Sequence, residues 1–126
     1  MEVTYKDFLD FANSQLAKES LSPFEVRNAV SRAYYALYHR ALERADELSI
    51  PKVRVENAGS HAALAKRIAS LGDSGKSLAS QLDKAKKVRV NCDYFLEERI
   101  NHKRAEFYLA SVQDLISKID RLEARK

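Results

Sequence analysis

The chain has 126 residues and a mass of 14.3 kDa, which is the size of one ordinary domain. Hydrophobic residues make up 45% of it and charged residues 32%, which excludes a disordered or low-complexity chain. Three Gly and two Pro are too few turn residues for the many short strands of a β-sandwich or barrel, so we expect an all-α protein.

The positive charge of the chain is unevenly distributed. The net charge is +4, from 22 Lys and Arg against 18 Asp and Glu. Residues 1–63 carry eight basic and nine acidic side chains, whereas residues 64–126 carry fourteen and nine. A polyanion such as a nucleic acid would therefore bind the C-terminal half.

The apolar segments, the N-terminal residues and the cysteine content indicate the compartment in which the protein functions. No segment approaches the roughly 18 consecutive apolar residues of a membrane span. Residues 1–7 lack the basic start and apolar centre of a signal peptide, so we expect a cytoplasmic protein with no membrane partner. Cys92 is the only cysteine, which excludes an intramolecular disulfide and a cysteine-based zinc cluster.

The first two expected helices have clear start signals. Thr4 and Asp7 mark the beginning of a helix whose apolar stripe runs to Leu16. In the run Ser22-Pro23-Phe24-Glu25, the serine is an N-cap, the proline occupies the first helical position, and the glutamate completes a capping box. This start predicts a long central helix to about Leu48, whose buried face comprises Val26, Val30, Ala33, Leu37 and Ala41.

The middle of the chain is less helical. Residues 49–59 contain a proline and two valines, and we predict a loop there. A short helix follows from about Ser60, as N-cap, to Leu71, and Gly72 suits the left-handed residue after a helix. Residues 72–75 are predicted to form a second loop.

Two further helices complete the expected bundle. The first has a seam of Leu78, Leu82, Ala85, Arg89 and Cys92, in which the arginine is an anomaly. The second extends from about Asn101 to Arg121, with apolar residues at alternating spacings of three and four. The sequence thus predicts an antiparallel bundle of four to five helices around one core.

Candidate functional residues lie on the central helix. Asn28, Arg32, Tyr35 and His39 recur at spacings of 4, 3 and 4, so they share one side of that helix. One interpretation is a polar network between helices or across a dimer interface. The other is a site in which His39 titrates near neutral pH and Arg32 binds a phosphate.

A second candidate group lies around Arg89. Asp93 follows four residues later, so one interpretation is an intrahelical ion pair. The alternative is that Arg89 projects into a groove made electropositive by Lys84, Lys86 and Lys87, where it holds a phosphate.

The remaining histidines have simpler interpretations. His61 has no second metal ligand nearby in the sequence, and we expect no metal and no cofactor. His102, with Lys103 and Arg104, either extends the basic surface or marks a solvated helix start. The sequence has no Gly-rich phosphate loop, His-Glu-x-x-His motif or Gly-x-Ser-x-Gly motif.

Three short motifs together resemble the HEPN family. Residues 31–39, Ser-Arg-Ala-Tyr-Tyr-Ala-Leu-Tyr-His, resemble a Tyr-Tyr-Ala-x-x-His run that small all-α HEPN proteins commonly carry in an early long helix. Arg89-x-x-x-Asp93-Tyr94 resembles a segment of a later family helix, and residues 59–61, Gly-Ser-His, resemble the pattern between them. Order and spacing match over roughly residues 20–120.

The resemblance implies a dimeric bundle, often encoded beside a minimal nucleotidyltransferase that serves as antitoxin. Residues 1–126 would form a single HEPN-like domain. Many family members are toxins or defence nucleases that cut RNA without a metal, through an Arg and a His four to six residues apart. Such groups can transfer the proton of a ribose hydroxyl and stabilise charge on the phosphate.

The chain departs from the family's active motif, because the residues from Val90 to Leu96 include no histidine. We therefore expect an RNA- or nucleotide-binding homodimer of a toxin–antitoxin or defence system that is not catalytic. The alternative is a metal-independent endoribonuclease with catalytic residues Arg89, His39, Arg32 and Asp93. In either case, the expected nucleic-acid contacts are Lys84, Lys86, Lys87, Arg89, His102, Lys103 and Arg104.

Overall fold

The computed structural model describes residues 2–123, and within them every regular element is a helix. The five helices are α1 (Tyr5–Leu16), α2 (Pro23–Glu47), α3 (Ser60–Ala69), α4 (Asp73–Tyr94) and α5 (His102–Asp120). The prediction of an all-α protein with up to five helices is confirmed.

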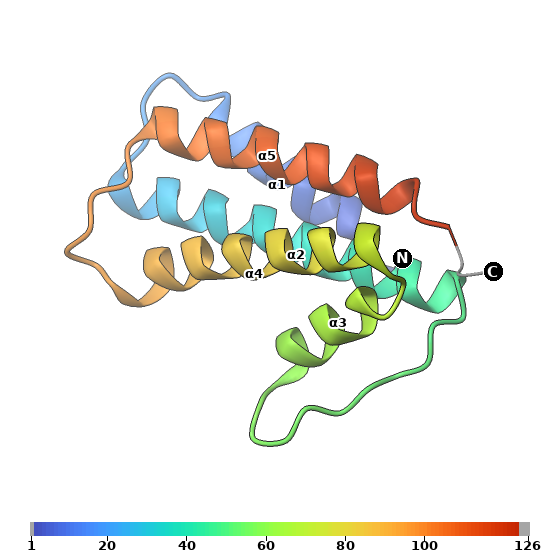
Figure 1. The fold of residues 1–126 in the computed structure, drawn as a ribbon. Helices are drawn as coiled ribbons and strands as arrows, with labels where there is room; N and C mark the ends of the chain where they lie inside the picture. The colour runs from blue at the N-terminus through green and yellow to red at the C-terminus, as the bar shows by residue number, and fades with distance from the viewer. Residues whose placement is uncertain (1, 124–126) are drawn as a thin grey trace.

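Helix α2 is the centre of the arrangement, because all four other helices pack against it. Helices α1, α4 and α5 lie alongside it, while the short α3 packs chiefly on α4, outside these four (Figure 1). Helices α1 and α4 run antiparallel to α2, whereas α5 runs parallel to it (Figure 1). The predicted buried face of α2 is confirmed, since Val30 and Leu37 are almost fully buried.

The predicted helix start at Ser22 is also confirmed. The amide of Glu25 donates to Ser22 Oγ at 3.2 Å, and the amide of Ser22 donates to Glu25 Oε1 at 3.0 Å. These two bonds satisfy free amides of the first turn. They also fix where α2 begins, and so which residues of α2 face the other helices.

Two predicted boundaries around α3 are wrong. Gly59, not Ser60, is the N-cap of α3. Residues 73–75 do not form a loop, because α4 already begins at Asp73, directly after Gly72 with its positive φ of 99°. Gly75 lies inside the first turn of α4, where a β-carbon would come within 2.2 Å of the carbonyl oxygen of Ile68. Glycine is needed here for the close approach of α3 and α4, not for a turn.

Candidate functional site

Arg89 is a buried cation on the inner face of α4. Its guanidinium donates to Asp93 Oδ2 at 3.0 Å, which confirms the predicted pairing across one helical turn. The group also lies against two aromatic rings of α2, 5.5 Å from the centroid of Tyr34 and 5.6 Å from that of Tyr35. Burial alone would lower the pKa of Arg89, but the bond to Asp93 and the nearby phenols raise it. The residue therefore carries a permanent positive charge inside the bundle.

Arg32 brings a second guanidinium to the same place. It lies 5.2 Å from the centroid of Tyr35, so that this ring has an arginine against it from α2 and another from α4. Arg32 Nη2 donates to Ser31 Oγ, which in turn donates to Asp93 Oδ2, each at 3.5 Å. We call Arg32, Tyr34, Tyr35, Arg89 and Asp93 the arginine–tyrosine cluster.

The arginine–tyrosine cluster holds more positive than negative charge. Among residues 2–123, no carboxylate lies within ion-pair distance of Arg32, and Asp93 is the one carboxylate paired with Arg89. The Nε atoms of both arginines are buried and have no hydrogen-bond partner in the part of the chain described. Two guanidinium groups beside one carboxylate leave an excess charge that an anion would neutralise.

His39 lies beside the arginine–tyrosine cluster, at the surface. Its ring is 5.3 Å from the rings of Phe8 and Tyr38 and 6.3 Å from that of Tyr35. Tyr35 thus contacts both His39 and Arg89. The structure brings the predicted residues Arg32, His39, Arg89 and Asp93 into one neighbourhood, around this tyrosine.

His61 joins this neighbourhood from α3, and the sequence analysis gave it no role. Its Nδ1 and the hydroxyl of Tyr34 are hydrogen-bonded at 2.5 Å, and its ring lies 4.6 Å from that of Tyr38. Burial lowers the pKa of His61, and electrostatic interactions with Lys86, Arg89 and His39 lower it further. Burial also raises the pKa of Tyr34, so the phenol stays protonated at neutral pH.

A small cavity lies where α2, α3 and α4 meet. It has a volume of about 50 Å³, and its polar lining is formed by Tyr34, Tyr38, His61, Asp83 and Lys86. Apolar side chains of α3 and α4 form the rest of its lining. The cavity borders the arginine–tyrosine cluster, because Tyr34 belongs to both.

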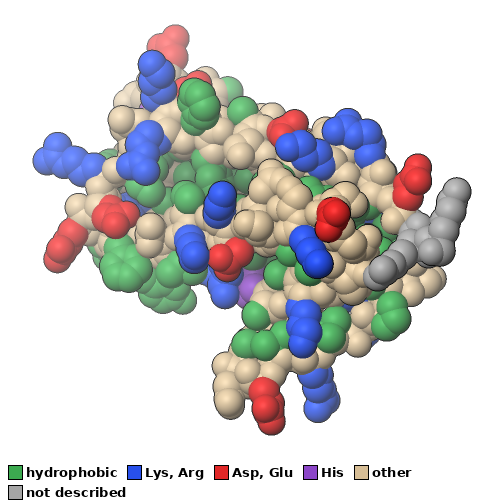
Figure 2. Space-filling model, in the orientation of Figure 1, with side chains coloured by type: hydrophobic (Ala, Val, Ile, Leu, Met, Phe, Trp, Pro, Cys, Tyr) green, Lys and Arg blue, Asp and Glu red, His purple; other side chains and the backbone are tan. Residues whose placement is uncertain are grey.

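The predicted lysines lie along α4 beside this cavity. Lys84 and Lys87 are exposed and Lys86 is half-buried. Lys87 pairs with Asp83 at 3.1 Å. Figure 2 shows Lys and Arg side chains on both sides of a histidine on the face formed by α3 and α4. Basic side chains of the C-terminal half therefore lie around the cavity, with Asp83 among them.

The remaining predicted basic residues lie in the first turn of α5, and they are His102, Lys103 and Arg104. The ring of His102 contacts the carbonyl of Leu16 at 2.7 Å and Glu106 at 3.1 Å, which ties α5 to the end of α1. The amide of Arg104 donates to the Asn101 side chain, an N-cap bond. These contacts give His102 a structural role, while Lys103 remains exposed.

Arg27 is a further residue that the sequence analysis missed. Its guanidinium donates to the carbonyls of Cys92 at 2.9 Å and Leu96 at 3.1 Å, and also to that of Glu98. These carbonyls would otherwise be free at the end of α4. Arg27 therefore fixes the last turn of α4, which carries Asp93. Cys92 is buried in the same turn, and burial raises the pKa of its thiol to about 11.

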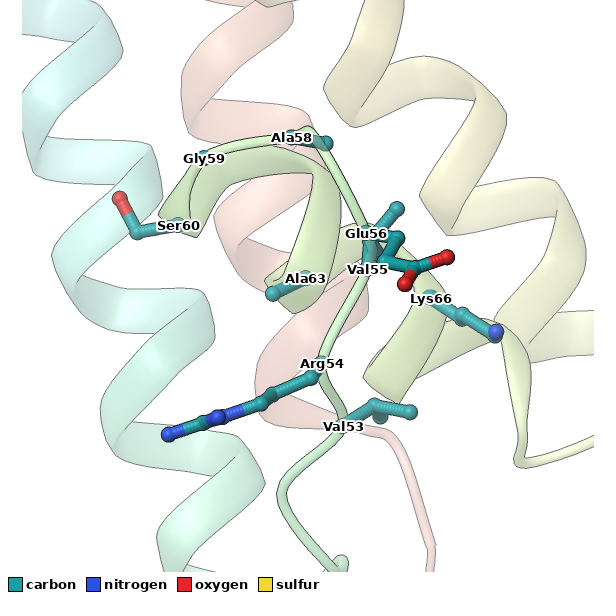
Figure 3. A pocket seen from close by; sticks show the side chains of 9 residues that line it. All are labelled: Val53, Arg54, Val55, Glu56, Ala58, Gly59, Ser60, Ala63 and Lys66. Atoms are coloured by element: carbon teal, nitrogen blue, oxygen red, sulfur yellow. The ribbon is translucent and has the colours of Figure 1, made fainter.

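A larger, open hollow lies between residues 53–59 and α3 (Figure 3). Its walls are mostly backbone and small side chains. Glu56 and Lys66 project on one side of it, while Arg54 points away from them (Figure 3). Because these few groups do not converge on a common point, we place the candidate site at the smaller cavity and the arginine–tyrosine cluster.

Three further observations bear on function. No helix within residues 2–123 is both long and apolar enough to cross a membrane. In the same range, no three His, Cys, Asp or Glu side chains are grouped so that they could hold a metal ion. Comparison with known proteins gave no match to a family model, a curated protein or a solved structure. The resemblance to the HEPN family therefore rests on the sequence motifs.

Proposed function

We propose that this chain is a HEPN-like protein that binds RNA or a nucleotide in a toxin–antitoxin or defence system, without cleaving it. The observation that carries the proposal is the arginine–tyrosine cluster. Its two guanidinium groups lie against one ring, only that of Arg89 pairs directly with a carboxylate, and the Nε atoms of both have no partner among the described residues. Guanidinium groups bind phosphate oxygens, and partly exposed tyrosine rings can stack on bases.

The surrounding surface supports the same function. Lys84, Lys86 and Lys87 add positive charge along α4, which would attract the phosphate backbone from a distance. Tyr35 and Tyr38 are partly exposed beside them. A basic strip with aromatic rings next to it is typical of proteins that bind single-stranded nucleic acid.

Fluorescence anisotropy with a labelled single-stranded RNA at low and moderate salt tests the proposal. We expect binding that weakens with salt. The Lys86→Gln/Lys87→Gln double variant and the Arg32→Gln variant should each weaken binding and reduce the salt dependence. For a single strand, the slope of log K against log salt should fall by about 0.7 for each phosphate that the variant no longer binds. Lys118→Gln removes one charge from α5 and is the control. RNA binding is refuted if the RNA does not bind or if all variants bind as well as the wild type, and the whole proposal fails if a nucleoside 5′-monophosphate does not bind either.

The homodimer and the nucleotidyltransferase partner are part of the proposal, on the strength of the resemblance. Large apolar side chains exposed at the end of α4 support an interaction surface, since Tyr94 is 72% exposed and Leu96 71% exposed. Sedimentation of the chain over a range of concentrations tests the dimer. We expect Leu96→Asp to shift it to the monomer, and a wild-type chain that is monomeric throughout would refute this part.

A further inference from the structure

Resting on the RNA- or nucleotide-binding function proposed above, we propose that the cavity between α2, α3 and α4 holds the terminal phosphate group of the ligand. The cavity differs from the arginine–tyrosine cluster in being small and in having two buried core residues, Leu64 and Leu82, in its lining. An internal phosphate is bonded to a nucleotide on both sides, so the RNA strand would have to leave the cavity in two directions. A terminal phosphate is bonded to one nucleotide, so the strand leaves in one direction only.

The hydrogen-bond donors of the cavity suit a phosphate. Tyr34 is 3% exposed, and its hydroxyl is hydrogen-bonded to Nδ1 of His61. When the phenol donates to Nδ1, the neutral imidazole carries its own hydrogen on Nε2. Lys86 adds an ammonium group from α4, and the Tyr38 hydroxyl adds another donor. Three helices thus supply donors to one small space.

The size of the cavity also suits a single phosphate group. A volume of about 50 Å³ accommodates a few water molecules, which the oxygens of one phosphate group would replace. A base or a ribose is too large to enter with it. The rest of the ligand would leave through the open side, toward the lysines of α4.

The titratable groups that face His61 come from two helices. Helix α4 contributes Lys86, Arg89 and Asp83, and α2 contributes His39 together with Tyr34 and Tyr38. The carboxylate of Asp83 opposes an anion, but Lys87 pairs with it at 3.1 Å. The balance at the cavity is therefore positive.

This environment links phosphate binding to a proton. Without a bound anion, burial and then the neighbouring positive charges favour the neutral imidazole of His61. A phosphate dianion beside Nε2 favours the imidazolium instead, so binding takes up a proton. The preference for a phosphorylated end should consequently increase as the pH falls from about 8 to about 7, above the range where the phosphate itself loses its second charge.

The test compares four ligands in anisotropy competition. Three are forms of one short RNA, which carries a 5′-phosphate, a 3′-phosphate or hydroxyls at both ends. The fourth is a nucleoside 5′-monophosphate. We expect one phosphorylated end to bind about tenfold more tightly than the hydroxyl form, the size of effect given by charge-assisted hydrogen bonds. His61→Gln and Lys86→Gln should reduce this ratio to near one. Lys76→Gln, an exposed lysine of the same helix, should retain it.

The outcomes separate this inference from the proposed function. Equal binding of all RNA forms, with the salt dependence intact, overturns the terminal-phosphate site and leaves RNA binding standing. A preference that survives both His61→Gln and Lys86→Gln overturns it too, because the phosphate then binds elsewhere. Absence of binding for every RNA and for the mononucleotide overturns both. Lys86 is half-buried in the cavity lining, so its variant answers the question even if His61→Gln does not fold.

Discussion

The close approach of α3 to α4 at Gly75 can be tested by adding a single carbon. In Gly75→Ala, the new β-carbon would lie 2.2 Å from the carbonyl oxygen of Ile68 and 3.0 Å from the β-carbon of Leu71. Carbon–oxygen contacts in proteins are ordinarily about 3.3 Å or longer. Helix α4 would therefore have to move by about 1 Å away from the end of α3.

The expected cost follows from two opposing contributions. Forcing extra volume into a packed contact costs about 1–3 kcal/mol, and a backbone carbonyl cannot rotate away as a side chain can. The greater helix propensity of alanine returns at most about 1 kcal/mol, and less in the first turn. We expect Gly75→Ala to lower the free energy of unfolding by about 2 kcal/mol.

Urea unfolding followed by circular dichroism measures this change. Gly59→Ala is the matched control, because it adds the same carbon at the start of α3, where nothing lies within 4 Å. Its backbone is extended, with φ at −87°, and we expect its free energy of unfolding to stay within about 0.5 kcal/mol of the wild type. If Gly75→Ala is as stable as Gly59→Ala, the described contact between α3 and α4 is wrong.

Three other predictions follow from the site. Arg27→Met leaves the carbonyls at the end of α4 without their donor, and we expect a loss of about 2 kcal/mol in the free energy of unfolding, with faster amide exchange beyond Cys92. Because the pKa of His61 is lowered in the folded state, the unfolded chain binds more protons than the folded chain once the pH falls to about 6.5. Stability should therefore fall as the pH drops from about 7.5 to 5.5, and His61→Gln should reduce that slope. In EDTA, we expect the chain to leave a mixed RNA pool uncut, with Arg89→Ala and His39→Ala as comparisons.

Each of these has an outcome that contradicts it. An Arg27→Met variant with wild-type stability would mean that water satisfies the same carbonyls equally well. A pH dependence that His61→Gln does not alter would place the titrating group elsewhere. RNA cleavage that both Arg89→Ala and His39→Ala abolish, with their helicity retained, would establish a metal-independent ribonuclease in place of a binding protein.

Local signals in the sequence located most of the helices. The capping box at Ser22 and the apolar spacing after it depend only on residues within a few positions of one another, and so the start and buried face of α2 could be predicted. Arg89 could be placed on an apolar seam and paired with Asp93 for the same reason. Gly75 was misassigned to a loop, because a glycine that allows a close helix contact looks the same in one sequence as a glycine in a turn.

The missed site residues depend on contacts between distant parts of the chain. His61 lies 27 positions from Tyr34, and nothing near His61 indicates which face of α2 the short α3 will meet. Arg27 donates to carbonyls more than 60 positions away, and a backbone carbonyl leaves no mark on residue type. A signal was present in the case of Tyr34, since a tyrosine on a buried helix face needs a partner for its hydroxyl.

The attachment of α3 has a consequence for how the molecule fluctuates. This helix has ten residues, packs chiefly on α4, and is preceded by residues 51–59, which form no regular element. Short elements of this kind open independently, at a lower free energy than the whole domain. When α3 detaches, His61 leaves with it and the cavity ceases to exist. A ligand in the cavity would therefore slow hydrogen exchange in α3 far more than in α1 or α5, and that difference would locate the ligand without a bound structure.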